Sequence, residues 1–257
     1  MAALVAGGVG LWYYSGGVQP LAPESVDLNE GDWLEHLYSQ NPKVAEEAVQ
    51  QLEERGASAL PEIQAVLHDP GAAVPLKKAA LKASGLLGPL AEPAVPDVAA
   101  HLTDPQLTEE AAVALSFMGR EAFAPLRDGA SSEDPVVRRE SLRSIGKLKE
   151  RAPLDARAVV PLLLEGLRDP DPGVRTVAAT YLGIIHAEAA DAVPALVVTL
   201  ADVEAEVRAA AATALGSFGA EAQSAVPALR KATADRNEDV AREAGVALVK
   251  LQGKEPK

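Results

Sequence analysis

The residues most able to catalyse a reaction are scattered along this 257-residue chain. It contains no cysteine, which excludes disulfides, thiolate nucleophiles and cysteine-based metal sites. No two histidines have the spacing of four residues that would place both imidazoles on one metal ion; they are His36, His68, His101 and His186. The run Gly7-Gly8-Val9-Gly10 lacks the strand before it and the Lys-Ser/Thr after it that a phosphate loop requires. We therefore expect no catalytic residue, cofactor site or metal site, and no enzyme.

Carboxylates instead recur at a fixed place in a repeat. An Asp follows a Pro by eight residues, or by nine at Asp134, six times along the chain, and the prolines are 29 to 36 residues apart. Such a period is typical of stacked helical hairpins. An Asp in front of a helix caps free N–H groups. The prolines are Pro61, Pro96, Pro125, Pro161, Pro194 and Pro227, and the aspartates are Asp69, Asp104, Asp134, Asp169, Asp202 and Asp235.

The segments between these markers predict two helices per unit. In the first segment of one unit, Val174, Val177, Ala178 and Leu182 are spaced as one apolar helical stripe. A Gly then ends the first helix in a left-handed conformation, and the Pro occupies the first turn of the second helix, where its missing N–H costs nothing. The glycines expected to end helices are Gly146, Gly183 and Gly216, and the corresponding prolines are Pro161, Pro194 and Pro227.

This pattern resembles HEAT repeats, and specifically the short HEAT-like repeats also found in phycobilisome lyases. The resemblance covers residues 41–250 and is strongest from Pro135 to Asp235. It implies an all-α fold, an α-solenoid of about six to seven hairpins over residues 29–251. Few aromatic residues (4%) among 48% hydrophobic ones also favour closely stacked helices over one deep core.

The resemblance also implies roles for particular residues. Arg175 and Arg208 are expected to join an Asp–Arg ladder between adjacent hairpins. The second helices are expected to line the concave face and to bind a protein partner there. The partner-binding residues predicted on that basis are Leu164, Glu165, Arg168, Val197, Val198, Arg230 and Lys231. The alternative for Leu164, Val197 and Val198 is packing against the adjacent repeat.

Several segments depart from the regular unit. Between Pro105 and Asp134 we expect a second helix that is short or irregular and makes a local bend, and Lys149 to Asp155 should form a protruding loop. Residues 29–39 should form a capping helix, residues 239–251 a last helix without a second one, and residues 252–257 a disordered tail. The N-terminal face is formed by Trp33, Leu34, Leu37 and Tyr38.

The N-terminal segment is unlike the rest of the chain. Residues 1–18 begin with an uncharged apolar run that ends in Trp12, Tyr13 and Tyr14, and residues 19–28, with Pro20 and Pro23, read as a linker. The run is short for a transmembrane helix and lacks the basic residues of a signal peptide. We expect a membrane anchor or an export signal; the alternative is a helix on a cytoplasmic protein.

The net charge and its distribution along the chain indicate which kinds of partner the protein binds. A net charge of −13 repels phosphate backbones, so we expect no nucleic-acid partner. A basic stretch from Arg138 to Arg151 is either a solvated helix face or a docking patch for an acidic partner. The deoxyhypusine hydroxylases, which are HEAT-like enzymes, carry His-Glu dipeptides, and none occurs here. The sequence thus predicts a non-catalytic protein-binding scaffold or complex subunit; the alternative is a lyase-type subunit resembling bilin lyases.

Overall fold

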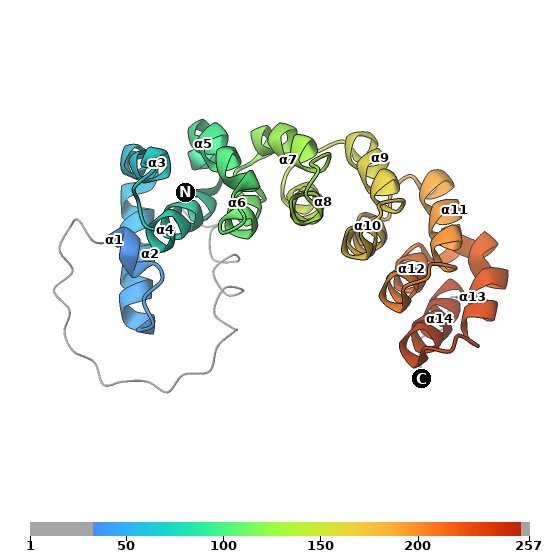
Figure 1. The fold of residues 1–257 in the computed structure, drawn as a ribbon. Helices are drawn as coiled ribbons and strands as arrows, with labels where there is room; N and C mark the ends of the chain where they lie inside the picture. Colours follow the sequence, from blue (N-terminus) through green and yellow to red (C-terminus); the bar gives the residue numbers. More distant parts are fainter. Residues whose placement is uncertain (1–32, 253–257) are drawn as a thin grey trace.

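The computed structural model describes residues 33–252, and within them it contains helices and no strands. The helices stack in sequential pairs as an α-solenoid, and they form two layers of one arc (Figure 1). The inner layer, on the hollow side of the arc, contains α4 (Val74–Leu87), α6 (Thr108–Leu115), α8 (Pro135–Arg151), α10 (Pro172–Ile185), α12 (Ala205–Ser217) and α14 (Glu238–Leu251). The outer layer contains α3 (Leu60–His68), α5 (Val95–Ala99), α7 (Phe123–Gly129), α9 (Ala156–Gly166), α11 (Ala189–Thr199) and α13 (Val226–Ala232).

The connections and the N-terminal end complete the described chain. The helices α1 (Trp33–His36) and α2 (Pro42–Arg55) pack at the N-terminal end of the stack. Short 3₁₀ segments connect many of the helices: η2 (Gly56–Ala59), η3 (Gly88–Ala94), η4 (Ala100–Thr103), η5 (Arg120–Ala122) and η6 (Gly219–Ala225). One hydrophobic core continues from Trp33 to Leu251, because each inner helix packs on the next inner helix and on its outer neighbours.

The repeat glycines do not end helices, so that prediction was wrong. Gly146, Gly183 and Gly216 lie inside α8, α10 and α12, and all three are buried. Their role is close packing between neighbouring inner helices. A Cβ on Gly146 would meet the Tyr181 ring at 2.0 Å, and a Cβ on Gly216 would meet the Cα of Ala247 at 3.1 Å. The same residue type therefore serves a different physical need from the one expected.

The repeat prolines follow the prediction in one of three units. Pro227 lies in the first turn of α13, whereas Pro161 and Pro194 lie inside α9 and α11. Both of these outer helices begin five residues before their Pro. In α9 the start is set by Asp155, whose side chain accepts a hydrogen bond from the N–H of Arg157 at 3.0 Å.

The boundary aspartates cap in two ways. Asp134 is the N-cap residue of α8 and accepts from the N–H of Val136, as expected. Asp169 instead accepts from the N–H of Asp171 in the turn, and Asp171 is the N-cap residue of α10. The boundary aspartates other than Asp134 likewise accept a hydrogen bond, within the turn, from the N–H two residues further along the chain, and the second carboxylate oxygen is left for another partner.

Of the two segments predicted to depart from the regular unit, one has the expected short helix and the other does not form the expected loop. The outer helix α7 is short, as predicted, although α5 and α13 are no longer than α7. The loop expected from Lys149 to Asp155 does not protrude: α8 continues to Arg151, Leu154 is buried, and the Lys149 Nζ donates to the Leu154 carbonyl at 2.5 Å.

A helix stands at each end of the described chain: α1 covers only part of the expected capping helix 29–39, whereas α14 covers the expected last helix 239–251. At the N-terminus α1 has four residues; Trp33, Leu34 and Leu37 are buried, whereas Tyr38 is 41% exposed. At the C-terminus α14 is the last helix of the stack. Among residues 33–252 no helix is long and apolar enough to cross a membrane. The predicted apolar segment 1–18, the linker 19–28 and most of the tail 252–257 lie outside the described residues.

Candidate functional site

The predicted partner-binding residues lie on the outer layer, not on the hollow side of the arc. They belong to α9, α11, α13 and the turn after α9, and these helices form the outside of the arc in Figure 1. The expectation that the second helices line the concave face was therefore wrong. The direction of curvature is the sum of small rotations between hairpins, and the spacing of residues within one hairpin does not fix it.

The members of that set also differ in exposure. Leu164 and Val197 are half-buried and pack against the core, which is the alternative considered for them. Val198 is 75% exposed. The four charged members are exposed: Glu165, Arg168, Arg230 and Lys231. These residues form no continuous apolar surface on the outer layer.

The inner helices present an ordered row of exposed positions. We call the surface formed by the exposed sides of α8, α10, α12 and α14 the inner face. Thr180 and Thr213 are exposed and lie at equivalent positions, six residues after the buried Val174 and Val207. Their neighbours on the same helices, Ala178 and Ala211, are fully buried on the opposite side. The row contains Arg143, Thr180, Thr213 and Val246, of which Arg143 and Val246 are half-buried. The next row, one turn further on, contains Lys147, Ile184, Ser217 and Lys250, of which Lys147 is half-buried.

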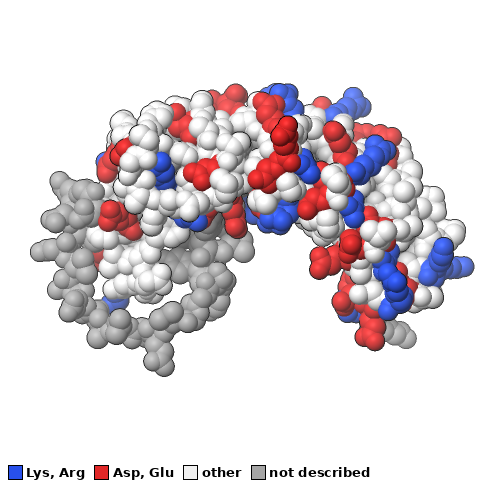
Figure 2. All heavy atoms as spheres, viewed as in Figure 1, with Lys and Arg blue, Asp and Glu red and all other residues white. Residues whose placement is uncertain are grey.

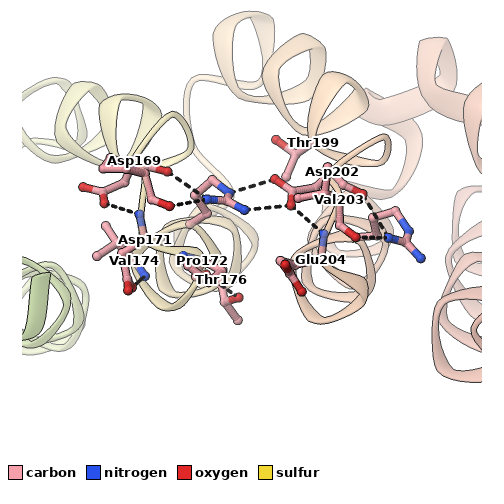
Figure 3. A network of polar contacts seen from close by, with 12 residues as sticks. Asp169, Asp171, Pro172, Val174, Thr176, Thr199, Asp202, Val203 and Glu204 are labelled. Atoms are coloured by element: carbon pink, nitrogen blue, oxygen red, sulfur yellow. Dashed lines mark hydrogen bonds and ion pairs between the residues drawn. The ribbon is translucent and has the colours of Figure 1, made fainter.

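A ladder of three Asp–Arg pairs holds these inner helices in register. The Arg175 Nε and Nη2 donate to both carboxylate oxygens of Asp202 at 2.8 and 2.9 Å, and its Nη1 donates to the carbonyls of its own turn at Asp169 and Pro170 (Figure 3). Each Arg therefore ties its own turn to the next. The other two pairs are Arg138–Asp169 and Arg208–Asp235. The predicted ladder is confirmed, and it includes Arg138 as well.

The ladder carboxylates are kept ionised. Burial alone would raise the pKa of Asp202, but the hydrogen bonds from Arg175 and from the N–H of Glu204 outweigh it and lower that pKa. The pKa of Asp169 is lowered in the same way, against burial, by Arg138 and the N–H of Asp171. The ladder spans only the C-terminal half: Thr108 and Ala241 stand at the positions equivalent to Arg175 in α6 and α14.

Charge is unevenly distributed over the surface. In Figure 2 blue and red spheres are dense over the middle and C-terminal part of the arc, whereas the N-terminal part is largely white. The central inner helix α8 carries Arg139, Arg143, Lys147 and Arg151, each four residues from the next. The basic stretch noted in the sequence is thus a stripe on the inner layer. Arg138 is not part of that stripe, because it belongs to the ladder.

Three of the histidines make polar contacts with other protein groups or stand at a helix end. The His68 ring is 2.7 Å from Asp97, His101 is 3.2 Å from the Leu67 carbonyl, and His186 lies at the C-terminal end of α10 with a left-handed backbone. Within residues 33–252 no group of three His, Asp or Glu side chains is placed to hold a metal ion.

Comparison with known proteins identifies the repeat. A family model described as HEAT repeats matches residues 123–204 and 160–250, the region that contains the ladder. No curated protein sequence matches this chain.

Solved structures share the fold. Importin beta is 15% identical with a TM-score of 0.62, and the match covers 86% of this chain and 33% of that one. Kap121p is 15% identical with a TM-score of 0.59, over 82% of this chain and 26% of that one. The Escherichia coli protein YibA is 18% identical with a TM-score of 0.57, over 86% of this chain and 82% of that one. At these identities the likeness concerns the fold. Together with the ladder and the match to the family model, it establishes that this chain is a HEAT-repeat protein.

Proposed function

We propose that this protein is a non-catalytic scaffold that holds a protein partner on its inner face. One observation carries the proposal: along consecutive inner helices the buried positions stay nearly constant while the exposed positions change. Ala178, Ala211 and Ala244 are all fully buried at one equivalent position. The row on the opposite side of these helices instead reads Arg143, Thr180, Thr213 and Val246, of which Thr180 and Thr213 are exposed and Arg143 and Val246 are half-buried. A constant packing pattern with a varying surface is what recognition of one extended partner requires, and solenoids use their concave surfaces in this way.

Rigidity supports the same proposal. The ladder and the close glycine contacts fix the relative positions of α8, α10, α12 and α14 before any partner binds. A preorganised surface loses less conformational entropy on binding than a flexible one. The inner face is therefore suited to a partner that lies across several repeats.

Site-specific cross-linking tests this proposal. A photoreactive amino acid is placed at Thr180 or Thr213 on the inner face, or at Val198 or Lys231 on the outer layer, in the full chain expressed in its own cells. We expect the inner-face positions to cross-link one common protein that the outer positions do not reach. Cross-links to that protein from the outer positions alone would refute the inner-face assignment and favour the originally predicted residues.

Attachment to a membrane, or export, is part of the proposal and is supported by the apolar run within residues 1–18. Cell fractionation of the full chain and of a chain without residues 1–20 tests it. The full chain should sediment with membranes or leave the cell, and the shortened chain should stay in the soluble fraction. Recovery of both chains in the cytoplasmic fraction would contradict it.

The lyase-type alternative rests on the subtype resemblance alone, since no structural observation favours it. Incubation with a bilin and its apoprotein distinguishes the two functions: transfer or binding of the chromophore would contradict the non-catalytic assignment.

A further inference from the structure

The inner face has one strongly cationic element, which we call the α8 stripe: Arg139, Arg143, Lys147 and Arg151. A spacing of four residues places these side chains on one side of the helix. The equivalent positions of the next two inner helices carry Thr, Ile, Ala and Ser, namely Thr176, Thr180 and Ile184 in α10 and Ala209, Thr213 and Ser217 in α12. Arg151 is equivalent to Glu188 and Glu221, which lie beyond the ends of α10 and α12, and α14 carries Arg242, Val246 and Lys250 at the first three positions. The repeat folds without a cation at any of these positions in α10 and α12, so the cations of α8 are not a requirement of the fold.

In the part of the chain that the structure describes, carboxylates form ion pairs with only one end of the stripe. The side chain of Glu140 is 5% exposed and accepts from the Arg139 Nε at 2.9 Å and from the Arg143 Nη1 at 3.0 Å. One carboxylate is thus shared by two guanidinium groups, both of which remain more than one-third exposed. Their outward N–H groups are available to a further acceptor.

At the other end of the stripe, the described residues supply no paired carboxylate. Within residues 33–252 no ion pair joins Lys147 or Arg151 to an acidic side chain. Arg151 lies over the Phe117 ring, with its Cζ 4.2 Å from the ring centroid, which holds the guanidinium in place without neutralising it.

The pKa of Lys147 reflects an excess of positive over negative charge around its side chain. Burial lowers its pKa, and the positive charges of Arg143 and Arg151 lower it further, against the opposing influence of Glu140 and Glu109. The cations around Lys147 therefore outweigh the nearby carboxylates. A bound anion would relieve this repulsion and raise the pKa of Lys147.

We propose that the α8 stripe binds an acidic segment of the protein partner, with carboxylates spaced about one helical turn apart. This inference rests on the proposed scaffold function and names the chemistry of its partner. Phe117, in the turn after α6, and Ile184 on α10 are the residues equivalent to Lys147 in the neighbouring repeats, so apolar side chains between the partner's carboxylates have surface to contact. A peptide fits better than a nucleic acid, because the whole chain has a net charge of −13 and repels a long phosphate backbone.

Binding of designed peptides to the full chain tests this inference. The probe is a fluorescein-labelled helical peptide with four glutamates, each four residues from the next, and its control is the same peptide with glutamine in their place. We expect the Glu peptide to bind at least about tenfold more tightly than the Gln peptide, and its affinity to fall as salt is added.

Matched variants locate the binding. Lys147→Gln with Arg151→Gln should weaken binding of the Glu peptide about tenfold, whereas Arg230→Gln with Lys231→Gln, the same charge change on the outer layer, should leave it unchanged. Lys147→Arg with Arg151→Lys preserves the charge and should preserve binding even if the packing changes. Circular dichroism checks that each variant is folded.

Three results would overturn the inference: equal binding of the Glu and Gln peptides, equal weakening by the two charge-removing variants, or displacement of the Glu peptide by an equal concentration of a single-stranded oligonucleotide. These results are separable from failure of the scaffold function. Cross-links from Thr180 and Thr213 without binding of the Glu peptide would refute only the acidic-segment inference. Binding of the Glu peptide without those cross-links would instead count against the scaffold proposal.

Discussion

Gly183 and Ala214 set the distance between two neighbouring inner helices: a Cβ on Gly183 would lie 2.6 Å from the Cα of Ala214. No non-bonded carbon atoms pack that closely, so α10 and α12 can approach as they do only because Gly183 has no side chain. The contact recurs between Gly85 and Ala114 at 3.1 Å and between Gly216 and Ala247 at 3.1 Å. The curvature of the arc therefore depends on these small residues.

Gly183→Ala should destabilise the protein, because the new methyl group forces the backbones of α10 and α12 apart. The expected loss in the free energy of unfolding is about 2–3 kcal/mol, measured by urea denaturation. Gly245→Ala is the matched control: it lies inside α14 with nothing within 4 Å of the added Cβ and should gain about 0.5–1 kcal/mol from helix propensity. Equal effects of the two substitutions would contradict the close-packing role.

The Arg175–Asp202 pair should show a favourable coupling energy in a double-mutant cycle. Both side chains are nearly buried, and two charge-assisted hydrogen bonds join them. With Arg175→Met, Asp202→Asn and the double variant, we expect a coupling of about 1.5–3 kcal/mol in the free energy of unfolding. Arg242→Met removes an exposed pair with Asp239 and should have no measurable effect. A coupling near zero for Arg175 and Asp202 would mean that the ladder does not stabilise the stack.

The ladder also predicts how stability depends on pH. The pKa values of Asp169, Asp202 and Asp235 are lower in the folded protein than the value of about 3.9 of a free Asp. Their stabilising contribution is therefore complete above that value and is lost as pH falls through it toward the folded-state pKa. The free energy of unfolding should decrease from about pH 5 downward, and Asp202→Asn should make that decrease shallower. An unchanged slope in Asp202→Asn would contradict this account.

Local features of the fold were predictable from the sequence, whereas features set between repeats were not. The hairpin period follows from residues within one unit, whereas the ladder, which joins adjacent units, was expected from the resemblance to HEAT repeats together with the six-residue offset from Asp169 to Arg175. The role of Gly183 depends on how closely the next helix approaches. Gly is favoured both where a helix ends and where two helices pack closely, so the sequence alone does not distinguish these two roles. The side of the stack that faces inward depends on rotations between units, so the expectation that α9, α11 and α13 line the concave face was wrong (Figure 1).

Ser141→Ala should raise stability. The hydroxyl of Ser141 is fully buried and has no hydrogen-bond partner in the described part of the chain, while Ala178, Ala211 and Ala244 stand at the equivalent positions. Removing an unsatisfied buried hydroxyl should gain about 1 kcal/mol in the free energy of unfolding. The control is Ser84→Ala, which should gain less, because the Ser84 hydroxyl donates to the Ala80 carbonyl at 2.9 Å. A loss of stability in Ser141→Ala would show that its hydroxyl does bond to a group, such as an ordered water.

The most direct test of the central claim is the affinity of the cross-linked partner for variants of the two surfaces. Thr180→Arg with Thr213→Arg obstructs the inner face, whereas Val198→Arg with Val203→Arg adds the same charge at two residues that are 75% and 77% exposed elsewhere. Isothermal titration calorimetry should show that the inner-face variant weakens binding at least about tenfold and that the control variant binds like the unaltered protein. Unchanged binding by the inner-face variant, with loss of binding in the control, would contradict the claim that the inner face holds the partner.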